Sequence, residues 1–205
     1  MDFRHEWKHE IGYADLLALR SRLAAVMGRD AHSIHGRYEI RSLYFDNLSD
    51  KALREKVDGV NCREKFRVRY YNGDTSYILL EKKSKINGLC AKEQAELEPR
   101  EVCAIAAGDA RLLADSQAKL VRELAFKMDT QGLRPRTIVD YTREPFVYGP
   151  GNVRVTLDHH LRTGMNCTDF LDPDCITVPA GDAPVILEVK WDSLDKLIKE
   201  CIKEL

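Results

Sequence analysis

A row of basic side chains at every second position stands out in residues 63–71. The segment reads Arg-Glu-Lys-Phe-Arg-Val-Arg-Tyr-Tyr, and successive side chains of a β-strand point to opposite faces. Phe66 and Val68 then share a face that can pack against a core. Cations on the other face lie about 6–7 Å apart, twice the strand rise per residue. Because like charges at this spacing repel, the pattern predicts a polyanion along the face formed by Arg63, Lys65, Arg67 and Arg69.

Other predicted strands repeat this division between an apolar and a charged face. They cover residues 4–11, 38–46, 77–85, 137–143, 153–161 and 185–191, and a further strand after Asn87-Gly88 carries Lys92, Gln94 and Glu96 on one face. Their charged faces add the cations Arg4, Lys8, Arg41, Lys83, Lys85, Arg143, Arg154 and Lys190. The same faces carry the carboxylates Glu6, Glu39, Glu81, Asp158 and Glu188. Solvation explains any one of these faces, but the recurrence of Arg and Lys without diluting Ser, Thr and Gln favours an enclosed polar lumen.

Helices and turns must position these strands. Helical spacing of apolar residues predicts helices at 13–27, 100–107 and 112–128, and Asp50 is placed to cap a short helix ending at residue 57. A last amphipathic helix is expected after Asp192 or Ser193. Asp58-Gly59, Asn72-Gly73 and Asn87-Gly88 are turn signals. The expected fold is α+β: an antiparallel eight-stranded β-barrel tunnel with a basic lumen, covered by surface helices, in a single domain spanning residues 1–205.

Composition limits the possible functions. The chain has 205 residues and a net charge of −1, so it lacks the bulk basicity of a nonspecific nucleic-acid binder. No apolar run reaches the roughly 18–20 residues of a membrane span, and the N-terminus does not resemble a signal peptide. The six cysteines show neither a Cys-x-x-Cys pair nor zinc spacing. We therefore expect a cytoplasmic chain with reduced, buried thiols.

Carboxylates among phosphate-binding cations indicate a particular chemistry. Arg offers forked donors and Lys compact positive charge to phosphate oxygens. A hard divalent ion such as Mg²⁺ or Mn²⁺ would bridge carboxylates to the same oxygens. The combination points to phosphoryl transfer. The histidines, including the adjacent pair His159 and His160, are interpreted as polar surface or lumen residues rather than metal ligands.

Seven segments, taken in order, resemble the VTC (vacuolar transporter chaperone) domain. They are Arg4-x-Glu6-x-Lys8, Ser42-Leu43-Tyr44-Phe45-Asp46, Arg63-x-Lys65-x-Arg67-x-Arg69-Tyr70, Leu80-Glu81-x-Lys83, Asp140-Tyr141-x-Arg143-x-Pro145-Phe146, Val153-Arg154-x-Thr156-x-Asp158 and Leu187-Glu188-x-Lys190. This domain is the polyphosphate polymerase branch of the triphosphate tunnel metalloenzymes. The resemblance implies a tunnel that transfers the γ-phosphate of ATP, or of another nucleoside triphosphate, to inorganic polyphosphate with Mn²⁺ or Mg²⁺.

The resemblance and the charged faces together assign roles to residues. Arg67, Arg69, Lys83 and Glu188 are the expected catalytic residues. The expected substrate-binding residues are Lys8, Arg41, Arg63, Lys65, Lys85, Tyr141, Arg143, Arg154 and Lys190. Glu188 is the leading candidate metal ligand, followed by Glu81, Glu6 and Asp158.

Two departures from the family pattern bear on activity. Arg4 replaces the first Glu of the Glu-x-Glu-x-Lys signature found in the hydrolases and cyclases, which favours the polymerase branch. The chain stops at Leu205, before the basic Ser-Lys-Tyr segment common at the tunnel mouth. Hydrolysis of triphosphate or tripolyphosphate, and polyphosphate binding without turnover, therefore stay as alternatives. A membrane partner that receives the product is a further expectation. RNA binding is disfavoured because Phe66, Tyr70 and Trp191 fall on packing faces and are not free to stack on bases.

Overall fold

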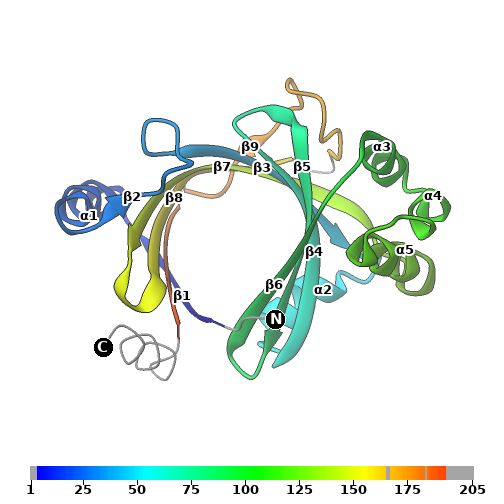
Figure 1. The fold of residues 1–205 in the computed structure, drawn as a ribbon, viewed down its shortest axis with the longest axis horizontal. Helices are drawn as coiled ribbons and strands as arrows, with labels where there is room; N and C mark the ends of the chain where they lie inside the picture. Colours follow the sequence, from blue (N-terminus) through cyan, green and yellow to red (C-terminus); the bar gives the residue numbers. More distant parts are fainter. Residues whose placement is uncertain (1–3, 165–166, 183, 193–205) are drawn as a thin grey trace.

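One curved antiparallel sheet dominates the computed structural model, which describes residues 4–164, 167–182 and 184–192 (Figure 1). Two-residue strands, β2 (Gly28–Arg29) and β9 (Val178–Pro179), pair with two of its eight long strands. Within the described residues, the outermost strands meet at one isolated bridge between Arg4 and Cys90. The predicted tunnel is thus confirmed. Apart from this bridge, the two edge strands are not joined by a hydrogen-bonded ladder in the described residues. The long strands follow the order β1 (His5–Ile11), β10 (Val185–Trp191), β8 (Val153–Gly164), β7 (Arg134–Tyr148), β3 (Tyr38–Asp46), β4 (Cys62–Tyr71), β5 (Asp74–Ile86) and β6 (Leu89–Glu96).

Two tight turns set the register of β4, β5 and β6. Asn72 and Gly73 have φ angles of 53° and 73°, and Asn87 and Gly88 have φ angles of 49° and 83°. Consecutive positive φ angles define the turn whose twist matches that of a β-hairpin, and Asn-Gly is its preferred sequence. Each turn therefore joins neighbouring strands directly, and β4, β5 and β6 form a meander along one wall of the tunnel.

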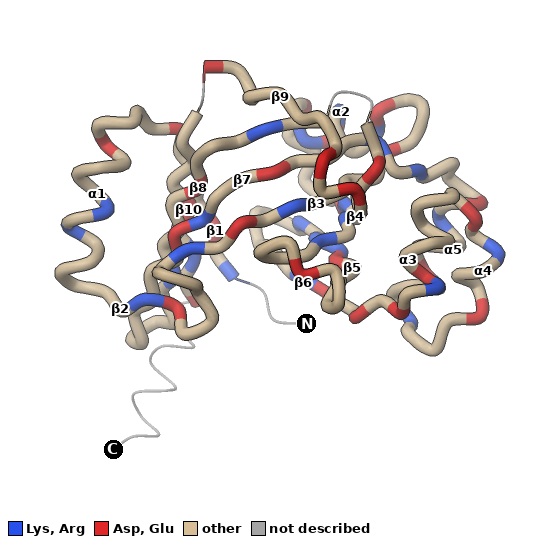
Figure 2. The backbone as a smooth tube through the Cα atoms, turned by 90° about the horizontal axis from the view of Figure 1, so that it is seen from above, with Lys and Arg blue, Asp and Glu red and all other residues tan. Residues whose placement is uncertain are grey.

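The helices lie outside the sheet in two groups, on opposite sides of the molecule (Figure 2). The first group is α1 (Tyr13–Val26). The second comprises α3 (Pro99–Ala107), α4 (Ala110–Ala114) and α5 (Lys119–Gln131). A short helix, α2 (Lys51–Val57), follows β3, and a 3-10 turn, η1 (Pro150–Asn152), precedes β8. In the described ranges, none of these helices has the length and apolar character needed to cross a bilayer.

The hydrophobic core lies between the sheet and these helices. Leu43, Val68 and Leu80 point outward from neighbouring strands and pack in one cluster with Leu124 and Met128 of α5. A smaller cluster joins Leu16 of α1 to Phe146 of β7 and Leu157 of β8. Burying each such side chain contributes about 1.5–3 kcal/mol. Because the apolar faces are turned outward beneath the helices, side-chain alternation turns the charged faces inward.

The helix predicted at 112–128 is wrong in one respect, because the structure divides it. The segment belongs to α4, which ends at Ala114, and to α5, which begins at Lys119. Between them, Ser116 is buried and its hydroxyl accepts a hydrogen bond from the Ala118 N–H at 3.1 Å. Serine side chains compete in this way with the helical backbone pattern. The interruption contains neither Gly nor Pro, so the apolar periodicity hides it.

The cap of α2 also differs from the expectation. Asp50 occupies the N-terminal position, but its side chain makes no capping hydrogen bond. The carboxylate of Asp46, at the end of β3, instead accepts hydrogen bonds from the Ala52 N–H at 2.9 Å and the Leu53 N–H at 3.1 Å. A side chain from the preceding strand therefore fixes the start of the helix. The final predicted helix lies outside the described residues.

The expectation of buried, reduced thiols fails for several cysteines. Cys62 and Cys103 are exposed, and Cys90 is half-buried. A disulfide joins Cys167 to Cys175, which lie eight residues apart in the loop that follows β8. Spacing along the chain did not reveal this pair, because the loop folds back on itself. Cys201 lies outside the described residues.

Candidate functional site

The inner faces of seven strands bring charged side chains together inside the tunnel. The outward neighbours of these residues pack under the helices, so strand alternation directs the charged residues inward. Eight cations face four carboxylates, which leaves an excess of positive charge on the inner face of the sheet. We call this set the lumen cluster. It comprises Glu6, Lys8, Lys65, Arg67, Arg69, Glu81, Lys83, Lys92, Arg143, Asp158, Glu188 and Lys190.

Arg67 and Arg69 of β4 share one carboxylate, that of Glu81 on β5. The Nη2 and Nε atoms of Arg67 lie 2.6 and 2.7 Å from Glu81 Oε2, and Arg69 Nη1 lies 3.9 Å away. Lys92 Nζ, from β6, lies 3.3 Å from the other carboxylate oxygen. Glu81 is only 2% exposed, and burial alone would raise its pKa. The nearby cations Arg67, Arg69 and Lys92 outweigh burial and lower the pKa of Glu81 to about 2.

Hydroxyl groups hold the same two arginines on their other side. Arg67 Nη1 donates to the Tyr44 hydroxyl at 2.9 Å, and Arg69 Nε donates to Ser42 Oγ at 2.9 Å. Both acceptors belong to β3, and they lie directly opposite these arginines in the β3–β4 register. Arg69 Nη2 also donates to the Tyr141 hydroxyl of β7 at 2.7 Å. The two guanidinium groups are therefore oriented by three hydroxyl groups before any ligand binds.

Glu6 of β1 and Glu188 of β10 form a second centre. Lys190 Nζ lies 2.6 Å from Glu188 and 3.5 Å from Glu6, and Lys8 Nζ lies 2.5 Å from Glu188 and 4.0 Å from Glu6. Lys83 from β5 reaches Glu6 at 2.6 Å. Burial would raise the pKa of Glu188, but Lys190, Arg143 and Lys8 hold it well below the usual range. Two carboxylates thus share ammonium groups from three strands.

Two further predicted arginines have carboxylate partners of their own. Arg143 binds Asp158 through Nε and Nη2, each at 2.6 Å. Arg154 lies 2.9 Å from Asp30, which follows β2. Arg143 is enclosed and its pKa is raised, because Tyr141, Asp158 and Glu188 outweigh the opposing effect of burial. Arg143 therefore keeps its positive charge at all ordinary pH values.

Like charges oppose one another across β4, β5 and β6. Arg63 is the register partner of Lys85, Lys65 is the partner of Lys83, and Lys83 is the partner of Lys92. Such directly opposed pairs destabilise a sheet. Lys65 makes no carboxylate contact within the described part of the chain. Burial, together with Lys83, Arg67 and Lys8, lowers the pKa of Lys65 to about 8 despite the opposing effect of Tyr44.

Only part of the predicted metal site fits a divalent ion. Among the described residues, no group of three or more His, Cys, Asp or Glu side chains is placed to hold a metal ion. Of the weaker candidates, Glu81 pairs with Arg67 and Asp158 pairs with Arg143. Glu6 and Glu188 do approach the same ammonium groups. A Mg²⁺-like ion needs only one or two carboxylates when phosphate and water supply its other ligands, so this pair fits one.

Arg41 does not belong to the lumen, which corrects its predicted placement. Arg41 shares a face of β3 with Leu43 and Phe45, which pack in the core outside the sheet. Ser42 and Tyr44 lie on the opposite face, toward the lumen. Its guanidinium binds Asp140 at 2.9 and 3.0 Å and donates to the backbone oxygen of Asp172. The other predicted substrate-binding and catalytic residues lie on inward faces, with Arg63 and Lys85 at one end of the wall formed by β4 and β5.

Three residues of the site were missed from the sequence. Ser42, Tyr44 and Lys92 contact Arg69, Arg67 and Glu81, respectively. Ser42 and Tyr44 share a strand face, and alternation from Leu43 could have placed them in the lumen. Their hydroxyl groups carry no charge, so a search for charged faces passes over them. Lys92 required the β5–β6 register, which places it opposite Lys83.

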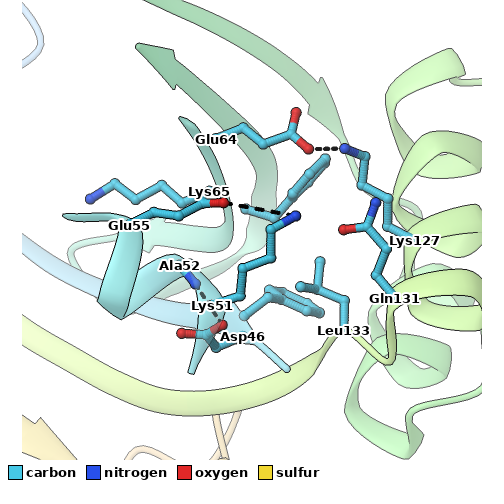
Figure 3. A pocket seen from close by; sticks show the side chains of 11 residues that line it. Asp46, Lys51, Ala52, Glu55, Glu64, Lys65, Lys127, Gln131 and Leu133 are labelled. Atoms are coloured by element: carbon cyan, nitrogen blue, oxygen red, sulfur yellow. Dashed lines mark hydrogen bonds and ion pairs between the residues drawn. The ribbon is translucent and has the colours of Figure 1, made fainter. Parts of the chain in front are cut away.

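A small pocket outside the tunnel is a structural junction between α2, β4 and α5 (Figure 3). Lys127 forms an ion pair with Glu64, and Lys51 Nζ lies 3.9 Å from Glu55 Oε1. Lys65 extends away from Lys127, as strand alternation requires (Figure 3). Lys51 and Lys127 at this pocket are therefore paired with carboxylates.

Comparisons with known proteins agree with this geometry. The family model described as "VTC domain" matches residues 3–205. A candidate adenylate cyclase of Bacillus halodurans has a similar structure, with 13% identity, a TM-score of 0.60 and coverage of 99% of this chain and 89% of that chain. A Pyrococcus horikoshii protein matches with 15% identity, a TM-score of 0.47 and coverage of 98% and 85%. No match is found among curated proteins. The likeness to solved structures concerns the fold alone.

Proposed function

The chain belongs to the VTC domain family, and from this premise we propose that it is a polyphosphate polymerase. In this proposal the tunnel binds a nucleoside triphosphate such as ATP and transfers its γ-phosphoryl group to the end of an inorganic polyphosphate chain. The family and the tunnel fold support a role in triphosphate or polyphosphate chemistry. The polymerase reaction itself is the part that we propose.

The observation that carries the proposal is the row of opposed cations on β4, β5 and β6. Arg63, Lys65 and Lys83 each face another cation across the sheet. A chain of phosphates would lie between such residues and neutralise each pair in turn. A single phosphate would neutralise only part of the row. The length of the basic wall therefore favours a linear polyanion over a compact one.

The arginine pair would bind the phosphoryl group that is transferred. Arg67 and Arg69 are held by Glu81 on one side and by Tyr44, Ser42 and Tyr141 on the other. Donors fixed in advance stabilise developing charge without having to reorganise during the reaction. The ammonium groups of Lys8, Lys83 and Lys190 would hold the neighbouring phosphates. Bound between Glu6 and Glu188, Mn²⁺ or Mg²⁺ would neutralise further charge on the phosphate oxygens.

Neither Glu81 nor Glu188 is suited to act as the general base that hydrolysis needs. A terminal phosphate oxygen is already anionic, so it attacks without a general base, whereas water requires one. An effective base has a pKa near the working pH. The pKa of Glu81 is about 2, and that of Glu188 is also strongly lowered. These groups are poor bases for activating water.

Incubation of the purified chain with ATP and Mn²⁺ tests the proposal. We expect ADP and a ladder of long phosphate chains on a gel, with internal phosphate signals in the phosphorus NMR spectrum. Release of orthophosphate alone would identify a hydrolase instead. Tight binding of polyphosphate without turnover would identify a binding module. Formation of cyclic AMP would identify a cyclase.

A further inference from the structure

Tyr44 is the only tyrosine in the described part of the chain whose hydroxyl contacts Arg67. Its hydroxyl accepts from Arg67 Nη1 at 2.9 Å, and Lys65 Nζ lies 5.2 Å from the centre of its ring. Lys65 has no carboxylate partner within the described residues. The Tyr44 ring is therefore placed between one cation that already has a carboxylate and one that has none.

The surroundings of Tyr44 favour loss of its proton while the tunnel is empty. Burial raises the pKa of a phenol, but Arg67, Lys65 and Arg69 outweigh burial and lower the pKa of Tyr44 to about 6. The charged groups that act on the Tyr44 phenol are Arg67, Lys65 and Arg69, all from β4. Arg67 is in turn bound to the carboxylate of Glu81 from β5.

We propose that the Tyr44 phenolate is a removable counter-ion of the empty tunnel, which takes up a proton when a phosphate chain binds beside Arg67 and Lys65. The phosphate oxygens then provide the negative charge that the phenolate provided before. The proton comes from solvent and forms the O–H bond of Tyr44, so no other reactant is needed. The inference rests on the proposed function in one respect, namely that phosphate chains bind in the lumen.

The proposal gives binding a defined pH dependence. Above pH 6 the empty tunnel has lost the Tyr44 proton, and binding must restore it. Linkage then weakens the affinity for a phosphate chain by up to about tenfold per pH unit for one proton taken up. Lys65 also titrates, with a pKa of about 8. Lys65→Arg keeps the positive charge and removes this second titration, so that variant isolates the contribution of Tyr44.

The direct test is a near-ultraviolet titration of the wild-type chain with tripolyphosphate at pH 7.5. Tyrosinate absorbs at longer wavelengths than tyrosine. We expect tripolyphosphate to remove about one equivalent of tyrosinate absorbance, and Tyr44→Phe to abolish this change. Calorimetry in two buffers with different ionisation enthalpies should show proton uptake on binding. Because the wild-type chain provides the signal, the test does not depend on whether the Phe variant folds.

Affinity measurements between pH 6 and pH 8 provide the second test. We compare Lys65→Arg with the double variant that also carries Tyr44→Phe. The Kd for tripolyphosphate should rise more steeply with pH in the single variant, by about a further tenfold per pH unit. Tripolyphosphate titrates equally in both measurements, so the difference belongs to Tyr44. Tyr141→Phe is the matched control, because it removes a similar hydrogen bond to Arg69. It should leave both the absorbance change and the pH slope in place.

Three results would overturn the inference, and they differ in what else they overturn. If tripolyphosphate binds without any loss of tyrosinate absorbance, Tyr44 is not the counter-ion, although the proposed function stands. If Tyr44→Phe weakens binding while the pH slope is unchanged, the residue only positions Arg67. If tripolyphosphate does not bind at all, the proposed function falls together with this inference.

Discussion

Arg67 is the side chain on which phosphoryl transfer should depend most. It combines bidentate contact with Glu81 and a hydrogen bond to Tyr44, which fixes its guanidinium group in the lumen. We expect Arg67→Ala to lower the rate of polyphosphate formation at least about 100-fold, the usual effect of removing one preorganised donor. Glu188→Ala should have a similar effect through loss of the carboxylate shared by Lys8 and Lys190. Product formation from ATP and Mn²⁺ provides the measurement.

The control for these variants is an arginine outside the tunnel. Arg136 is exposed and pairs with Asp50 at 3.1 Å on the surface, where an ion pair contributes little. Arg136→Ala should keep full activity and an unchanged unfolding midpoint. Circular dichroism should show the native fold for the Arg67 and Glu188 variants as well. If either of them retained wild-type turnover, the assignment of the arginine and carboxylate centres would be refuted.

Lys65 should show that the site sacrifices stability for binding. Its folded pKa of about 8 lies below the ordinary value of 10.5, so the folded state disfavours the charged form. This penalty is complete below pH 8 and is relieved as pH rises toward 10.5. We expect Lys65→Met to stabilise the empty protein by about 2 kcal/mol at pH 7 while it weakens tripolyphosphate binding.

Urea unfolding of both proteins between pH 7 and pH 10 measures the effect of Lys65. The wild-type free energy of unfolding should rise across this range relative to that of Lys65→Met, and the two should converge. A Met variant that is less stable than wild type at pH 7 would show that Lys65 has a favourable partner. In that case the uncompensated charge would not be the reason for the site's affinity.

At the scale of elements, a partly buried ion pair joins α1 to the sheet. Arg20 of α1 binds Glu144 of β7 through Nε at 2.9 Å and Nη2 at 2.6 Å, and His159 Nε2 lies 3.0 Å from the same carboxylate. Burial would raise the pKa of Glu144, but His159 and Arg20 lower it to about 2. A lowered carboxylate pKa gives stability above the unfolded value, which is lost as pH falls toward 2.

Glu144→Gln should therefore destabilise the protein without affecting the tunnel. We expect a loss of about 2–3 kcal/mol at pH 7, because Arg20 and His159 lose the charge that they contact. The difference from wild type should shrink between pH 4 and pH 2. Chemical unfolding at several pH values measures it, and tripolyphosphate affinity at pH 7 should remain unchanged. A reduced affinity would mean that α1 positions the lumen strands more tightly than its outward location indicates.

The elements themselves differ in how far the sequence predicts them. Strand β4 and the hairpins beside it follow from alternation and from two Asn-Gly pairs, which are local signals. The break between α4 and α5 does not, because Ser116 acts through its own hydroxyl in a buried position. Arg41 was misplaced because a charged residue on an outward face is unusual, and its partner Asp140 lies on a strand distant in sequence.

At the scale of the whole molecule, alternation predicts which residues face the lumen but not which of them meet. The pairing of Glu6 with Lys83 and Lys190 joins the first strand of the chain to strands that lie far along it. Those contacts depend on how the sheet curves, and the curvature is not encoded in any one segment. For this reason the sequence did not show that the candidate ligands Glu81 and Glu188 lie in two separate centres.

The net charge of −1 conceals an uneven distribution, since the lumen cluster alone contains four more cations than carboxylates. A linear polyanion should therefore stabilise the folded chain as a whole. At 100 times its Kd, tripolyphosphate should add about 2.7 kcal/mol, which corresponds to a rise of about 5–10 °C in Tm for a chain of this size. Orthophosphate at the same concentration should give a smaller rise, because it spans fewer of the opposed cations.

Sodium chloride at 0.5 M should reduce the effect of tripolyphosphate by screening, with a Debye length below about 10 Å. Thermal unfolding with Arg67→Ala and Arg136→Ala in parallel locates the effect, which only the first variant should diminish. Equal shifts from tripolyphosphate and from sodium chloride of matched ionic strength would show that the tunnel responds to salt in general and does not bind phosphate chains.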